Sequence, residues 1–166
     1  MLKGILRMVL NVIIILILFL LQLYVFNNMY VFGARFNLVA MYVIIFSMIN
    51  NLKLSLPVSF IIGILTDIIL GNGKLQYMLI FMIIAIVLET LKLIYKQDNS
   101  MSVAVYSTAG ILVLETISAI FTAISNGIVI NIFSFIFFVI KVLVLNILLA
   151  YLMYYITIRL GEKLER

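Results

Sequence analysis

Six apolar stretches separated by short polar breaks run along the whole of this 166-residue chain. The hydrocarbon core of a bilayer is about 30 Å thick, and a helix needs roughly 20 apolar residues to cross it. The breaks are clusters of Asn, Gly and Lys, which are typical of turns. Strict alternation of apolar and polar residues, the pattern of a membrane β-barrel, is absent. The sequence therefore predicts an all-α, polytopic integral membrane protein.

The composition excludes most other classes of protein. Hydrophobic residues make up 67% of the chain and charged residues 10%, whereas a soluble domain is about half apolar and a quarter charged. The chain has no Cys and no His, which excludes disulfides, thiolate chemistry, haem ligation and most zinc sites. Phosphate-binding loops, nucleophile elbows and long basic clusters are also absent. We expect no catalytic residues, no metal, no cofactor and no nucleic-acid partner.

The breaks divide the chain into a single transmembrane domain over residues 1–166, a compact bundle of six helices with short loops. The expected helices cover about residues 5–26, 36–49, 54–70, 75–94, 101–124 and 134–158. The last apolar stretch is too long for one upright helix. We therefore expect Ile128–Ser134 to lie in the outer leaflet before the final crossing.

The distribution of Lys and Arg predicts the orientation. With six crossings and both termini inside, eight basic residues lie on the inner side and two, Arg35 and Lys74, on the outer side. The best arrangement with five crossings gives seven against three. Cytoplasmic loops carry the excess of Lys and Arg, so the charges favour six crossings with both termini in the cytoplasm.

Small and polar residues follow one face of the third expected helix. They are four residues apart along the chain: Ser55, Ser59, Gly63, Asp67 and Gly71. This spacing places them on the same side of a helix, and small residues let membrane helices approach closely. The face is therefore either a packing seam with a partly solvated Asp67, or a functional site or partner contact.

Two further charges fall inside the expected spans. Glu115 lies in the fifth helix and Lys141 in the sixth, and together with Asp67 they occupy the outer half of the membrane. Charged groups within a bilayer are costly and face a partner or a wet cavity. The simplest expectation is that Lys141 pairs with one of the two carboxylates and holds the bundle together. An ion or proton relay is the alternative.

Polar residues elsewhere have simpler interpretations. On the first helix, Asn11 and Gln22 share a face with Arg7 and are expected to face the interior of the bundle. Near the inner end of the fourth helix, Glu89 and Lys92 are three residues apart, which suits an interfacial ion pair.

Two segments resemble the family of the rod shape-determining protein MreD. The stretch S-F-I-I-G-I-L-T-D-I-I-L-G is similar to the family's G-F-x-x-G-L-x-x-D segment, with matches at Phe60, Gly63, Leu65 (shifted by one) and Asp67. The stretch G-A-R-F-N-L is similar to its R-P-D/N-L segment, with matches at Arg35, Asn37 and Leu38. Gln22 also fits the family. Ser59 stands where a glycine is usual, and Phe36 where a proline is usual.

This resemblance implies a non-enzymatic scaffold of the bacterial inner membrane that binds MreC and supports lateral peptidoglycan synthesis and cell shape. Other implied partners are a polymerase of the SEDS type, a class B penicillin-binding protein, actin-like filaments and membrane lipids. The implied architecture is similar to the S-component-like fold.

Two alternatives belong to other classes. One is the substrate-binding S subunit of an energy-coupling-factor vitamin transporter, which is also a small six-helix bundle. Such subunits usually carry an A-x-x-x-A pair on the first helix and Trp near the pocket, and this chain has neither. The other is a small ion or proton carrier that uses Asp67, Glu115 and Lys141.

Overall fold

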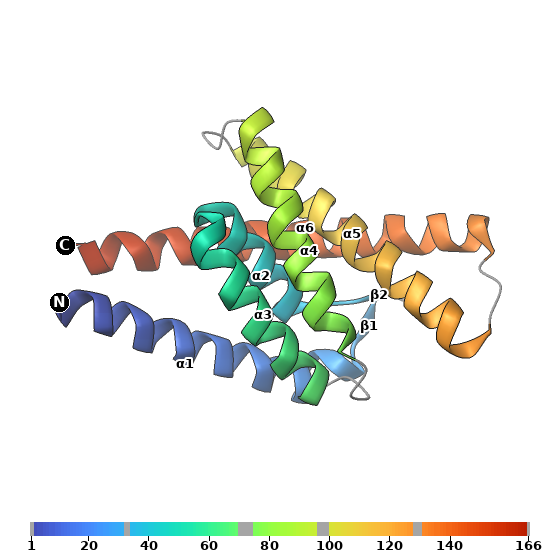
Figure 1. The fold of residues 1–166 in the computed structure, drawn as a ribbon, viewed down its shortest axis with the longest axis horizontal. Coiled ribbons are helices and arrows are strands. Elements are labelled where there is room, and N and C mark those ends of the chain that lie inside the picture. The colour runs from blue at the N-terminus through green and yellow to red at the C-terminus, as the bar shows by residue number, and fades with distance from the viewer. Residues whose placement is uncertain (1, 32–33, 70–74, 96–99, 128–130, 166) are drawn as a thin grey trace.

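Six α-helices make up almost all of the fold (Figure 1). The computed structural model describes residues 2–31, 34–69, 75–95, 100–127 and 131–165. The helices are α1 (Leu2–Tyr24), α2 (Leu38–Ile49), α3 (Leu52–Ile69), α4 (Gln76–Ile94), α5 (Ser100–Asn126) and α6 (Ile132–Glu165). The predicted all-α class is confirmed. The helices begin and end within a few residues of the expected ranges, except that α6 continues to Glu165.

The connection between α1 and α2 contains a short hairpin. A 3₁₀ turn, η1 (Phe26–Asn28), leads to β1 (Tyr30–Val31), which pairs antiparallel with β2 (Ala34–Arg35). The rings of Phe26 and Phe36 pack edge to face at 5.4 Å, and Ala34 is fully buried. The hairpin is thus anchored to the bundle and fixes the point at which α2 begins.

Four helices, α3 to α6, are long and apolar enough to cross a membrane. The α2 helix has 12 residues, which corresponds to about 18 Å at 1.5 Å per residue, less than the hydrocarbon thickness. The chain is therefore a membrane protein, and α2 is shorter than an upright crossing of the hydrocarbon core requires.

The short helix α2 is the centre of the bundle. It contacts α1, α3, α4, α5 and α6, and ten of its 12 residues are buried. Asn37 caps its first turn by accepting a hydrogen bond from Ala40 N at 3.0 Å. A helix that is apolar on all sides is stable only when it is surrounded, which explains why this uncharged segment lies inside the bundle.

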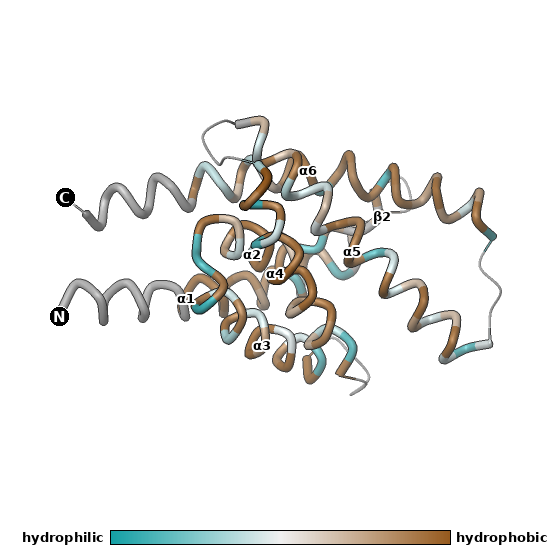
Figure 2. The backbone as a smooth tube through the Cα atoms, turned by 45° about the horizontal axis from the view of Figure 1, so that its top comes forward, coloured by the Kyte–Doolittle hydropathy of each residue, from teal (hydrophilic) through white to brown (hydrophobic). Residues whose placement is uncertain are grey.

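The two outer helices, α1 and α6, run in opposite directions along the long axis of the molecule, so that the chain begins and ends at the same end (Figure 1). The last turns of α5 and the first turns of α6 diverge from the other helices at the opposite end. Hydrophilic segments lie mainly at the ends of the helices, including the α2–α3 turn and the start of α6 (Figure 2).

The start of α6 differs from the expectation. Ile132, Phe133 and Ser134 form its first turn, so α6 begins two residues before the expected position, while residues 128–130 lie outside the described part of the chain. Asn131 explains the early start, because its side-chain oxygen accepts hydrogen bonds from Phe133 N and Ser134 N. The resulting helix of 34 residues is about 51 Å long and exceeds the thickness of a bilayer core.

Candidate functional site

The small polar face of α3 is buried in the bundle. Ser55, Ser59, Gly63 and Asp67 are all buried, while Gly71 lies outside the described residues. The Ser55 hydroxyl shares its one proton between the carbonyls of Asn50 and Asn51 and thereby closes the α2–α3 turn. The face therefore contacts protein along the length that the structure describes.

Gly63 lies at a close contact between α3 and α4. A Cβ atom added to Gly63 would overlap the Cα atom of Met78, and it would lie 2.9 Å from Met78 N and 3.0 Å from Tyr77 O. All three are backbone atoms, which cannot turn aside as the end of a side chain can. Only glycine allows the two backbones to approach this closely.

Asp67, one turn after Gly63, binds the first turn of α4. Its two carboxylate oxygens accept hydrogen bonds from Tyr77 N and Met78 N, each at 2.9 Å, and the residue is 2% exposed. The N-cap of α4 is Leu75, which makes no side-chain capping bond. Asp67 replaces this missing cap from the neighbouring helix, where its charge is also favoured by the helix dipole.

Amide side chains form a second polar cluster around the start of α2. Gln22 donates to Phe36 O at 3.0 Å and accepts from Leu38 N at 2.9 Å. Asn146 of α6 accepts from Asn37 N at 3.2 Å and donates to Val142 O at 3.0 Å. These bonds link α1, α2 and α6 through buried groups, and we call Gln22, Asn37 and Asn146 the amide clamp.

Sequence reasoning placed Gln22 toward the interior but assigned no role to Asn146. A signal was available, because a single amide in the middle of a long apolar helix must find a hydrogen-bond partner. Its partner, the backbone N–H of Asn37, is 109 residues away in the chain, so only the fold identifies it.

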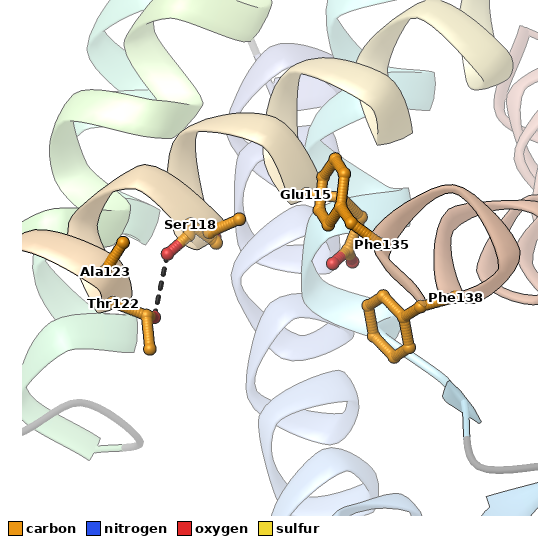
Figure 3. A pocket seen from close by; sticks show the side chains of 7 residues that line it. Glu115, Ser118, Thr122, Ala123, Phe135 and Phe138 are labelled. Atoms are coloured by element: carbon orange, nitrogen blue, oxygen red, sulfur yellow. Dashed lines mark hydrogen bonds between the residues drawn. The ribbon is translucent and has the colours of Figure 1, made fainter. Parts of the chain in front are cut away.

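Glu115 faces a pocket of about 270 Å³ between the diverging parts of α5 and α6 (Figure 3). Ser118, Thr122 and Ala123 of α5 line one side of the pocket, and Phe135 and Phe138 of α6 line the other. The Glu115 carboxylate points toward the two phenylalanine rings (Figure 3). The Thr122 hydroxyl donates to the carbonyl of Ser118 at 2.8 Å, so it satisfies its own helix instead of the carboxylate.

Lys141 is exposed on α6. In the described part of the chain, the ion pair that the structure contains is Lys92–Glu89, at 2.8 Å, in agreement with the predicted interfacial pair. Lys92 also donates to the carbonyl of Asn50. The expected ion pair of Lys141 with Asp67 or Glu115 is not present among the described residues. Asp67 instead accepts hydrogen bonds from backbone N–H groups.

Two other candidates have no described side chain. Asn11 belongs to α1, and Arg35 pairs with Tyr30 in the hairpin. Among the described residues, no three His, Cys, Asp or Glu side chains lie close enough to hold a metal ion. Asp67 and the amide clamp thus hold the fold together, whereas Glu115 and Lys141 form no ion pair among the described residues.

Comparison with known proteins agrees with the motifs on α3 and the hairpin. The family model described as rod shape-determining protein MreD matches residues 3–164. No curated protein and no solved structure matches the chain.

Proposed function

Because the chain belongs to the MreD family of rod shape-determining proteins, we propose that it acts as a non-enzymatic membrane scaffold of the cell-elongation complex. In this role it binds MreC and supports lateral peptidoglycan synthesis and rod shape. The SEDS polymerase, the class B penicillin-binding protein and the actin-like filaments are further proposed members of the assembly. The match from residue 3 to residue 164 is the observation that carries the proposal.

The use of the polar side chains supports a scaffold. Asp67 binds two backbone N–H groups, and Gln22 and Asn146 bind the segment before α2. A catalytic site needs a nucleophile or an acid–base pair within reach of a substrate, whereas these groups are already occupied within the chain. They provide rigid packing between helices, which suits a docking platform.

We also propose six crossings of the bacterial cytoplasmic membrane, both termini in the cytoplasm, and an arrangement similar to the S-component-like fold. The opposite directions of α1 and α6 (Figure 1) and the eight-to-two excess of basic residues support this orientation. A central helix as short as α2 can cross where its neighbours thin the bilayer locally.

Complementation of a rod-shaped bacterium that lacks its own MreD tests the proposal. Expression of the full chain should restore rods, and MreC should be captured with the tagged chain from detergent-solubilised membranes. Asp67→Leu should still insert into the membrane but lose most of the MreC capture, because α4 loses its cap. Ile68→Leu is the matched control, since Ile68 is adjacent but 70% exposed.

Two outcomes would contradict the scaffold. Capture of a coupling ATPase module in place of MreC would identify a vitamin transporter subunit. Saturable transport by the purified chain in liposomes would identify a carrier.

A further inference from the structure

Glu115 and Lys141 are opposite charges that the described part of the chain leaves without an ion-pair partner. We propose that they pair between two copies of this chain, so that Lys141 of each copy binds Glu115 of the other across a two-fold axis. This inference goes beyond the scaffold function, because it concerns self-association.

The position of Lys141 on α6 argues against a pair within one chain. The buried stripe of α6 consists of Val139, Val142, Asn146, Ala150 and Met153. At 3.6 residues per turn, Lys141 lies about 140° around the helix from this stripe, so it points away from the bundle. Glu115 contacts α6 at Phe135 and Phe138, which lie about 120° and 60° around the helix from Lys141, and no ion pair joins Glu115 to Lys141 among the described residues.

The two charges nevertheless share one continuous surface. Phe138 lines the Glu115 pocket, is 39% exposed, and lies between the pocket and Lys141 on the surface of α6. Lys141 follows Phe138 by one helical turn, about 4.5 Å along the axis. Side chains of a helix lean toward its N-terminus, which directs the Lys141 ammonium toward the depth of Glu115.

A two-fold axis along the membrane normal keeps both copies in the same orientation and at the same depth. Because a two-fold interface is self-complementary, an acceptor and a donor at similar depth on one surface form two equivalent ion pairs, with Phe138 near the axis. Intramembrane charges are costly when they face lipid, and pairing offsets part of this cost for both groups.

The surface of α6 around Lys141 is exposed and is not covered by the other helices of the bundle. Only 17% of the apolar stretch of α6 is buried, compared with 28–33% for α3, α4 and α5. The pocket at Glu115 contains Ala119 and Ala123, which leave room for the end of a lysine side chain. Charge complementarity therefore selects a second copy of the chain as the occupant.

Co-capture of two differently tagged copies from detergent-solubilised membranes tests the proposal. Wild-type copies should capture each other, whereas Glu115→Gln in both copies, or Lys141→Met in both copies, should reduce the capture several-fold. A mixture of one Glu115→Gln copy and one Lys141→Met copy keeps one of the two ion pairs and should recover an intermediate level. Ile140→Met, at a neighbouring exposed position, should behave as the wild type.

Pairing within one chain predicts no recovery in the mixture, because neither copy then contains both charges. Absence of recovery, equal capture by all variants, or absence of capture by the wild type would each overturn the proposal. The last two results are those expected if Lys141 instead reaches lipid phosphates.

Cross-linking gives an independent readout, because the chain contains no native cysteine. Phe138→Cys alone should form a disulfide-linked dimer in native membranes under mild oxidation. Leu93→Cys, on α4 and 85% exposed, should remain a monomer. A dimer from Leu93→Cys but not from Phe138→Cys would overturn the proposed surface.

Discussion

Two carboxylates in this bundle have opposite surroundings. Asp67, at the α3–α4 junction, is 2% exposed, and both of its oxygens accept hydrogen bonds from backbone N–H groups. Glu115, at the α5–α6 pocket, faces two phenylalanine rings, and the Thr122 hydroxyl of the same pocket donates to the carbonyl of Ser118. The same functional group thus forms part of the fold in one region and remains available to another molecule in the other.

The backbones explain this difference. At the α3–α4 junction Gly63 brings α4 so close that its first N–H groups come within reach of Asp67. At the α5–α6 pocket the two helices diverge and are separated by side chains. The distance between helices therefore decides whether an intramembrane charge is satisfied internally.

The largest expected effect is at the close contact. Gly63→Ala should lower the free energy of unfolding by about 2–3 kcal/mol, the upper part of the overpacking range, because the new methyl group meets backbone atoms of Met78 and Tyr77. Ala123→Leu adds more volume but enters the open pocket, and it should cost less than about 1 kcal/mol. Thermal unfolding in detergent measures both. Equal decreases in the free energy of unfolding would contradict the difference in packing between the α3–α4 contact and the α5–α6 pocket.

Disruption of the amide clamp should lower the free energy of unfolding by a smaller amount. Asn146→Leu leaves the N–H of Asn37 without its acceptor, and an unsatisfied buried donor costs about 1–3 kcal/mol. We expect a loss of about 1–2 kcal/mol and faster hydrogen exchange at Asn37. Val144→Leu is the control on the same helix, because Val144 is 63% exposed. Unchanged exchange at Asn37 would show that the clamp does not hold the start of α2.

A still smaller effect is expected at Leu75, which has a φ of +48°. A left-handed conformation costs a non-glycine residue about 1–2 kcal/mol. Glycine avoids this cost, but it loses more conformational entropy on folding, which offsets part of the gain in stability. Leu75→Gly should therefore raise stability by less than about 1 kcal/mol. Leu75→Ala keeps the conformational cost and should bring no gain. Equal stability of the two variants would mean that Asp67 holds this junction without opposing strain.

The sequence predicts the helices and the buried face of α3 well. Long apolar runs define the helices, and the four-residue spacing of Ser55, Ser59, Gly63 and Asp67 places them on one side, where all are buried. The partner of Asp67 was not predictable, because it depends on the register of α4 beside Gly63. Every residue except proline has a backbone N–H group, so the sequence does not show which of these groups bind a side chain.

The surroundings of Lys141 show another limit. Its place within an apolar run predicts that it needs a partner, but not the direction in which it points. That direction depends on which side of α6 packs on α2, and the side containing Val142 and Asn146 does so. An almost uniformly apolar helix leaves this choice to the shape of the whole bundle.

Substitution of the two carboxylates by their amides tests the contrast most directly. Thermal unfolding of Asp67→Asn and Glu115→Gln would be compared in detergent, at a dilution where the chain is monomeric. Asp67→Asn should lose about 1–3 kcal/mol, because an amide offers one acceptor where two N–H groups need it. Glu115→Gln should lose nothing, or gain slightly, because an uncharged group is less costly in an apolar site. An equal loss for both variants, or a larger loss for Glu115→Gln, would contradict the account.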